Sequence, residues 1–486
     1  MPDVHYISGK YLDLETIGQI LRGQHTLALS EEAEQRIVQG HTYLQLKINA
    51  PERPIYSTGT QTQTYQPDQE QLQRNLLLAH ACGVGMEVPQ DMVKLMLLLK
   101  IQSLAHGHSG VQLKTVKRLI DFYNREVYPV VYQQGSAGAG DAVPLAHLCL
   151  PLAGLGEVSF QGYKLASEHV LEMFSWEPVT LNAGEGLALL SGTQFTATYG
   201  VLALLDAQRL SRQADMIGAL SLDAFDGSLE TFNALIHRLH PHKGQRETAA
   251  AVRQLLEGSE LMQRQKRHGL DPYSFQGMPQ VHGATKDAIT FTAGLVETEI
   301  NTVTGDPIVF QEEDTVLSGG ISHGQPLELA LDFLATALAN LGGISERRSC
   351  QLVSGLRGLP EFLVAEPGIN TGFLASQSTA AAIVSQNRQL CTPASTGSFN
   401  AREDYICMGA NAATKLYQVV ENVERVLAIE LLHAAQALDF RRPLRSSPVL
   451  EKLVAAYREK VPFMATDRML HHDVKASIAF LREYPF

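Results

Sequence analysis

The chain has 486 residues, which is enough for more than one domain and a large hydrophobic core. Its residues are 45% apolar and 19% charged, as in ordinary soluble globular proteins. The net charge is −12 and no basic cluster stands out, so a nucleic-acid partner is not expected. The first residues lack the basic and apolar segments of a signal peptide, and no stretch reaches the roughly 18 apolar residues of a membrane span. We therefore expect a cytoplasmic protein without a membrane partner.

The cysteines and histidines indicate neither a disulfide framework nor a metal site. The cysteines are odd in number and scattered at no metal-ligand spacing: Cys82, Cys149, Cys350, Cys391 and Cys407. Such a set suits reduced thiols in a cytosolic chain. The paired histidines lack a carboxylate and a third ligand at a recognisable spacing. We predict that the protein binds no metal.

Residues 1–195 mix short helical stretches with polar or glycine-rich loops, which predicts a mixed N-terminal domain. Two loops stand out, at 51–70 and 133–142. The second loop lacks the Lys-Ser/Thr end of a P-loop and the preceding strand of a dinucleotide fingerprint, so nucleotide binding is not expected. Its glycines would let the backbone approach a ligand closely.

Long apolar helices dominate residues 196–486. Residues 326–341 begin with proline, are followed by two glycines, and are apolar around most of the helix circumference. Residues 411–438 have the same character. This pattern is typical of helices buried inside a bundle. Strand-like runs such as 306–310 are few, so we predict a mainly α protein whose second part is a long-helix bundle with a C-terminal helical region.

Several short segments occur in an order that points to a known family. The most specific is 135–148, which reads Gly-Ser-Ala-Gly-Ala-Gly-Asp-Ala-Val-Pro-Leu-Ala-His-Leu. Residues 71–85 read Gln-Leu-Gln-Arg-Asn-Leu-Leu-Leu-Ala-His-Ala-Cys-Gly-Val-Gly. Further matches lie at 106–110, 185–194, 271–274, 301–304, 318–325, 344–348 and 402–404. Together these segments resemble the histidine and aromatic amino-acid ammonia-lyases.

This resemblance implies a fold, an assembly and a cofactor. The fold would be the fumarase/aspartase-like helical superbundle with a mixed N-terminal domain. The protein would be a homotetramer whose active sites are built from several subunits, and the enzyme would be of the carbon–nitrogen lyase type. Members of the family carry the electrophilic cofactor methylidene-imidazolone (MIO), which forms when an inner Ala-Ser-Gly segment cyclises on itself.

The chain departs from the family at the residue that MIO requires. In the family the run reads Gly-Ser-x-Gly-Ala-Ser-Gly-Asp, whereas here Ala139 is followed directly by Gly140 and Asp141. The serine whose dehydration supplies the methylidene carbon is absent. Cyclisation at Ser136 instead would displace the ring and put a methyl group where the attacking nitrogen needs room. We therefore expect no MIO, and a loop of Ala139, Gly140 and Asp141 in its place.

Other expected substrate-binding positions also differ from the family. Ser191 replaces an asparagine, and Gln276 replaces the arginine that pairs with the substrate carboxylate, so a charged clamp becomes a neutral amide. The Asn-Phe pair before His-Gly-Gln has become Ile-Ser, which ends in Ser322. Asn301 lies in a matching segment, and by the resemblance we assign it to substrate binding as well.

The acid–base residues of the family are retained. By the resemblance, Tyr56 matches the loop tyrosine that serves as catalytic base, and Tyr273 matches a second tyrosine of the site. His80 and Glu403 match the pair that faces the substrate side chain in histidine-directed members. We assign Tyr56, Tyr273 and Glu403 to catalysis and His80 to substrate binding. Retained acid–base residues beside an altered electrophile favour changed chemistry over an inactive enzyme.

Three functions remain open from the sequence. The first is an enzyme without MIO that uses Tyr56 for elimination, isomerisation or cyclisation of a small substrate. Because a tyrosine with a pKa near 10 cannot replace MIO, this substrate would need a more acidic C–H, as in a carrier- or CoA-bound thioester. The second is a conventional MIO ammonia-lyase whose printed sequence lacks the modified residue. The third is a non-catalytic homologue that binds a metabolite. Intact mass beside the encoding DNA separates the first two.

Overall fold

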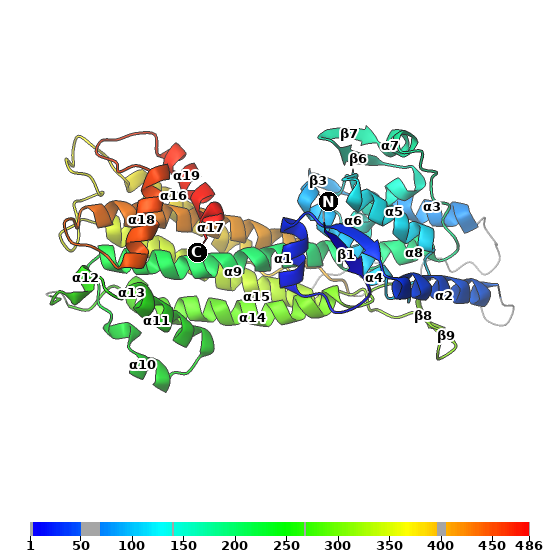
Figure 1. Ribbon diagram of the computed structural model, residues 1–486, viewed down its shortest axis with the longest axis horizontal. Coiled ribbons are helices and arrows are strands. Elements are labelled where there is room, and N and C mark those ends of the chain that lie inside the picture. The colour runs from blue at the N-terminus through cyan, green and yellow to red at the C-terminus, as the bar shows by residue number, and fades with distance from the viewer. Residues whose placement is uncertain (1–2, 50–68, 139, 267–268, 396–404, 486) are drawn as a thin grey trace. The chain divides into compact units, whose positions relative to one another are not determined.

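The computed structural model in Figure 1 describes residues 3–49, 69–138, 140–266, 269–395 and 405–485. These residues form two compact units. Unit 1 comprises Met1–Leu202, Ala293–Asp332 and Pro393–Thr414, and unit 2 comprises Ala203–Thr292, Phe333–Thr392 and Lys415–Phe486. The sequence predicts a single boundary near residue 195. Each observed unit instead combines segments from distant parts of the chain.

Unit 1 contains short helices and small sheets. The helices that lie wholly in it are α1 (Leu14–Arg22), α2 (Glu31–Ile48), α3 (Gln69–His80), α4 (Gln90–Leu104), α5 (Leu113–Asn124), α6 (Ala142–Cys149), the 3-10 helix η1 (Leu150–Ala153), α7 (Ser167–Met173) and α8 (Glu185–Leu190). Parallel strands β1 (Val4–Ile7) and β2 (Thr26–Leu29) form one sheet. Antiparallel pairing joins β3 (Val84–Glu87) to β5 (Tyr132–Gln134), β6 (Glu157–Phe160) to both β4 (Tyr128–Pro129) and β7 (Tyr163–Ala166), and β8 (Ile308–Phe310) to β9 (Thr315–Leu317).

Local sequence explains two helices of unit 1 directly. The hydroxyl of Ser30 caps α2 by accepting a hydrogen bond from the Ala33 N–H, and acidic residues in the first turn favour the positive end of the helix dipole. Helix α4 has a different character, since its side chains are buried almost without interruption from Met92 to Leu104. It is therefore a core helix of this unit.

Unit 2 is a helical bundle with peripheral short helices. The helices that lie wholly in it are the 3-10 helix η2 (Glu230–Phe232), α10 (Ala234–Leu239), α11 (Lys243–Leu255), α12 (Glu260–Gln263), α13 (Tyr273–Gln276), α16 (Leu374–Leu390), α18 (Pro448–Lys460) and α19 (Leu470–Glu483). The long helices contribute residues to both units: α9 (Gln194–Ala224), α14 (Met278–Ile300), α15 (Gln325–Val353) and α17 (Gly409–Asp439). The prediction of a mainly α protein is confirmed.

Helix α15 is longer than its sequence predicts. The glycines after residue 341 predict a helix end there, yet α15 continues to Val353. A Cβ atom at Gly342 would lie 3.3 Å from a side-chain carbon of Val423 on α17. Here glycine serves close packing between two helices. That gain in packing outweighs its low helix propensity.

Two stretches are long and apolar enough to pass as membrane spans by composition, contrary to the sequence-based expectation. They are Glu185–Ala224 and Gln325–Val353. Within the first, which comprises α8 and α9, 89% of the most apolar window is buried, so this stretch belongs to the core. In the second only 56% of the window is buried. Phe333 of this second stretch is 51% exposed and contacts Phe291, which is 57% exposed, so unit 2 presents an aromatic surface.

A buried polar network connects the long helices inside unit 2. Arg348 on α15 donates to both carboxylate oxygens of Glu430 on α17, at 2.6 and 2.8 Å, and both side chains are fully buried. Its third nitrogen donates to Nε2 of His282 on α14. Because a guanidinium can only donate, the proton of a neutral His282 is on Nδ1, which donates to Asp215 on α9 at 2.8 Å. The network thus fixes His282 as a neutral ring.

Two buried histidines predict acid sensitivity of unit 2. Burial lowers the pKa of His282 from 6.5 to about 4 and the pKa of His433 from 6.5 to about 3. As the pH falls below 6.5, the unfolded chain binds protons that the folded chain excludes, so stability is lost between pH 6.5 and about 4 through His282 and between pH 6.5 and about 3 through His433. Each pKa shift corresponds to a loss of about 3–5 kcal/mol. We expect the urea midpoint to fall through this window. The fall should be shallower in His433→Leu, and identical pH profiles would contradict the assignment.

Candidate functional site

The glycine-rich loop of unit 1 is the centre of the candidate site. Gly140 has φ +109°, a conformation that residues with side chains rarely adopt. A Cβ atom there would lie 2.7 Å from the carbonyl oxygen of Gly192 and 2.8 Å from that of Ser322. Both neighbours are backbone atoms, so neither can rotate away. The loop therefore requires glycine at position 140, and its backbone touches two other segments of unit 1.

Buried Asp141 holds this loop against the start of α9. Its two carboxylate oxygens accept hydrogen bonds from the backbone N–H and the hydroxyl of Thr196, both at 2.8 Å. Its own N–H donates to the Gly192 carbonyl at 2.8 Å. Burial raises the pKa of Asp141 to about 6, while the hydrogen bonds from Thr196 favour its charged form. On the other side of the loop, the Ser136 hydroxyl donates to the Gly140 carbonyl at 2.9 Å.

A buried lysine holds the segment that packs on Gly140. Lys100 of α4 is 1% exposed, and its ammonium donates to the carbonyls of Ala188 and Ser191 at 3.0 and 2.8 Å. These carbonyls end helix α8, where a positive charge is favourable. Burial lowers the pKa of Lys100 to about 8. The Ser191 hydroxyl donates to the Leu187 carbonyl of α8, so the hydroxyl and the carbonyl of Ser191 both have partners.

Two further segments meet the loop. Ser322, which is 7% exposed, contacts Gly140 through its carbonyl, as described above. Cys407 is buried, and its N–H donates to the carbonyl of Gly138 at 3.3 Å. Close to these residues in sequence, the His323 ring stacks on Tyr405 with 5.9 Å between ring centroids. The structure thus brings Gly140, Asp141, Ser191 and Ser322 together, and the substrate contacts assigned to Ser191 and Ser322 stay predictions.

His80 is the last residue of α3 and is half-buried. Its Nδ1 lies 2.8 Å from the Leu76 carbonyl, which can only accept, so Nδ1 carries the proton. Nε2 of the neutral ring is then left as an acceptor. Gly83 follows three residues later and lies against the start of the glycine-rich loop, since a Cβ atom at Gly135 would lie 3.3 Å from the Cα of Gly83. The chain that follows His80 therefore borders the glycine-rich loop.

The remaining predicted residues occupy other positions. The Asn301 amide makes three hydrogen bonds, two with the backbone of Leu12 and one with the carbonyl of Glu297, so this structure gives it a bracing role and its substrate contact stays a prediction. Tyr273 and Gln276 lie on α13 in unit 2. Tyr273 is 87% exposed, and the Gln276 amide donates to the Asp271 carbonyl.

Three predicted residues lie outside the described residues: Tyr56, Ala139 and Glu403.

The sequence analysis missed Lys100, Thr196 and Gly192. Lys100 had a usable signal, because it is the single charged residue in the apolar run 95–105, and a charge inside a core helix requires buried partners. Gly192 lies inside a matching segment but had no assigned role. Nothing in the sequence around Thr196 marks it as the partner of Asp141.

Comparison with known proteins identifies the family. Residues 12–459 match the aromatic amino acid lyase family. A histidine ammonia-lyase from Myxococcus xanthus is 42% identical, with 97% of this chain and 95% of that protein covered. One from Symbiobacterium thermophilum is also 42% identical, over 96% of this chain and 94% of that protein. The chain belongs to the aromatic amino acid lyase family.

Solved structures of the family have the same fold. Histidine ammonia-lyase from Trypanosoma cruzi superposes with a TM-score of 0.91 at 36% identity, covering 99% of this chain and 93% of that one. Ergothionase from Treponema denticola has a TM-score of 0.91 at 26% identity, with 99% of both chains covered. The predicted helical superbundle fold and the prediction of a lyase-family enzyme are confirmed.

These findings correct two expectations from the sequence. The prediction of an enzyme without MIO that acts on a thioester or other small substrate was wrong, because relatives named histidine ammonia-lyase match almost the full chain. The expectation of no cofactor was wrong for the same reason, since MIO is the prosthetic group of histidine ammonia-lyases. One missing residue in a loop weighs less than likeness along the whole chain. The comparisons favour the conventional MIO lyase.

The loop can be tested for its fit to MIO. The third residue of the cyclising segment must lack a side chain, and Gly140 meets this need in a cradle that a Cβ would fill. Asp141 and Ser136 hold the peptide groups around it. The cradle therefore fits the group. The printed sequence passes directly from Ala139 to Gly140, so the precursor serine is the one element that it does not contain.

Proposed function

We propose that this protein is a histidine ammonia-lyase. It would break the Cα–N bond of histidine and remove a proton from Cβ, leaving ammonia and a conjugated imidazole acrylate. The observation that carries this proposal is the 42% identity to proteins named histidine ammonia-lyase over at least 96% of the chain. The Gly140 cradle and the tautomer of His80 support it.

MIO would supply an electrophilic carbon that makes the amine a better leaving group and the β-proton more acidic. Gly140 would hold it, and Asp141 and Lys100 would keep its surroundings fixed. Asp141 binds the loop to α9, while Lys100 holds the backbone that packs on Gly140. Such bracing matters because a displacement of about 1 Å at a reacting centre can cost on the order of 100-fold in rate.

The proposal requires a serine between Ala139 and Gly140 in the encoding DNA. The intact mass of the purified protein, measured beside that DNA, tests this requirement. A chain lighter by two water molecules than its encoded sequence, with the serine encoded, would support MIO in the loop. Encoding DNA that also lacks the serine would overturn this part of the proposal.

The acceptor nitrogen of His80 suits an imidazole substrate. With its Nδ1 proton donated to Leu76, the ring offers the Nε2 lone pair to an N–H donor, and the histidine side chain carries such a donor. Purified protein incubated with histidine should release ammonia together with an ultraviolet-absorbing product, whereas phenylalanine and tyrosine lack this N–H and should react more slowly. No release of ammonia from histidine would overturn the proposed reaction.

The tyrosine expected to act as base gives a direct kinetic prediction. Tyr56→Phe deletes only a hydroxyl, and general acid–base groups contribute about 10²–10⁴-fold, so kcat should fall at least about 100-fold with folding intact. His80→Ala and Glu403→Gln should instead act mainly on KM or on substrate choice, because both match the side-chain end of the pocket. Steady-state kinetics on the three variants checks this contrast. Full activity in Tyr56→Phe with none in Glu403→Gln would make Glu403 the base.

The exposed aromatic surface supports a homotetramer. Phe291 and Phe333 are each about half exposed and pack edge to face, so they offer an apolar surface that a second subunit would bury. The number of four subunits comes from the family resemblance, so light scattering should give four times the mass of the chain. A monodisperse monomer at micromolar concentration would contradict this assembly.

A further inference from the structure

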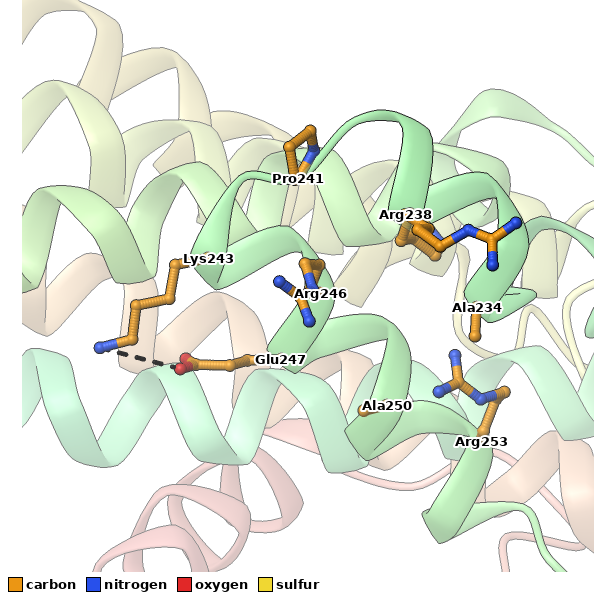
Figure 2. A pocket seen from close by; sticks show the side chains of 9 residues that line it. Ala234, Arg238, Pro241, Lys243, Arg246, Glu247, Ala250 and Arg253 are labelled. Carbon is orange, nitrogen blue, oxygen red and sulfur yellow. Dashed lines mark ion pairs between the residues drawn. The ribbon is translucent and has the colours of Figure 1, made fainter.

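A positively charged pocket lies between α10 and α11 in unit 2. Its volume is about 680 Å³, and none of its lining residues is assigned to the lyase site. Figure 2 shows its lining along α11, with the Lys243–Glu247 pair at one end, Arg246 in the middle and Arg253 at the other end. Arg238 comes from α10. The volume is that of a small-molecule site, for which about 300–1,000 Å³ is typical.

The charges of this pocket are not balanced. Four cationic side chains line it against the single carboxylate of Glu247, in a chain whose net charge is −12. Glu247 lies 4.0 Å from Lys243, and both side chains are exposed, so their mutual stabilisation is weak. Within the described residues, Arg238 and Arg246 have no hydrogen-bond acceptor or ion-pair partner, which leaves both guanidinium groups available for a ligand.

The floor of the pocket is held rigidly. Buried His237 receives a hydrogen bond on Nδ1 from the Gln245 amide at 2.9 Å, and its Nε2 donates to the Thr231 carbonyl at 3.0 Å. The Gln245 oxygen accepts in turn from His240 at 2.8 Å. These bonds fix α10 against α11 and use both ring nitrogens of His237. The relative position of α10 and α11, from which the two arginines extend, is therefore set before any ligand arrives.

We propose that this pocket binds a small multivalent anion that carries phosphate or carboxylate groups. Guanidinium groups match both anions with paired N–H donors, and two arginines on facing helices suit a ligand with more than one charged group. Bound anion would link α10 to α11. This site goes beyond the lyase reaction and does not depend on it.

Calorimetric titration of the full-length protein tests the proposal, with pyrophosphate and citrate as probes at constant ionic strength. We expect saturable binding of at least one probe, and a matching rise in the thermal unfolding temperature. Arg238→Gln combined with Arg246→Gln should weaken binding about tenfold or more. The matched control, Arg388→Gln combined with Lys475→Gln, removes two exposed cations of the same unit outside the pocket and should leave binding unchanged.

The two probes also separate the sources of the ligand. Tighter binding of pyrophosphate indicates a phosphorylated ligand, and tighter binding of citrate indicates a polycarboxylate; either result supports the site. Three results would overturn it: no binding of either probe to the wild-type protein, equal weakening in the control variant, or the same heat with acetate as with the multivalent probes. None of these readouts uses lyase activity, so failure here leaves the proposed reaction untouched.

Discussion

Gly140→Ala is expected to abolish ammonia release while leaving both units folded. The new methyl carbon would sit 2.7 Å from the Gly192 carbonyl oxygen and 2.8 Å from that of Ser322, closer than a real Cβ atom comes. The Gly192 carbonyl is also held by the N–H of Asp141, so the backbone has little freedom to yield. On the proposed function, a side chain at this position would in addition block the cyclising nitrogen.

A second glycine separates backbone strain from crowding. Gly162, in the turn between β6 and β7, also has a positive φ of +80°, but a Cβ there would meet no atom within 4 Å. Gly162→Ala should therefore cost only about 1–2 kcal/mol of stability from strain and leave activity unchanged. Ammonia assays and thermal unfolding on both variants give the comparison. Wild-type activity in Gly140→Ala, or equal loss in Gly162→Ala, would refute the crowding argument.

Much of the fold could be predicted from hydrophobic patterning. The apolar run 411–438 predicts α17 to within two residues at each end, because a helix buried on all sides needs apolar residues all around. The predicted end of α15 was wrong because Gly342 packs against Val423 of α17. These two residues are 81 positions apart, and sequence alone does not show such a contact. The division into two units is not visible in the sequence for a related reason, since the long helices contribute to both.

The candidate site was predictable only in part. The resemblance located the loop, but Lys100 bonds to residues 88 and 91 positions away and Thr196 to a residue 55 positions away, which no local pattern shows. The predicted reaction was wrong because the missing serine received more weight than the many segments that match the family. Of the site residues, Tyr56, Ala139 and Glu403 lie outside the described residues, so their roles remain predictions.

Arg348→Met is expected to destabilise the protein by about 3–5 kcal/mol. The substitution leaves the carboxylate of Glu430 fully buried with the Ser221 hydroxyl as its remaining hydrogen-bond donor, and it removes the donor to His282. An uncompensated buried charge is far more costly than a lost surface pair, because the interior cannot replace the hydration that the carboxylate has lost. The urea midpoint and the thermal unfolding temperature should both fall.

Lys460 of the same unit provides the control. Its side chain is 58% exposed and its partner Glu483 is 68% exposed, so Lys460→Met removes one positive charge at a cost of at most about 1 kcal/mol. Equal destabilisation by the two variants would show that burial is not the cause. Combining Arg348→Met with Glu430→Leu removes both charges, and much of the lost stability should then return, since apolar side chains of similar volume can replace a buried ion pair. If the double variant were as unstable as Arg348→Met alone, the cost would come from lost packing among α14, α15 and α17 rather than from the unpaired carboxylate.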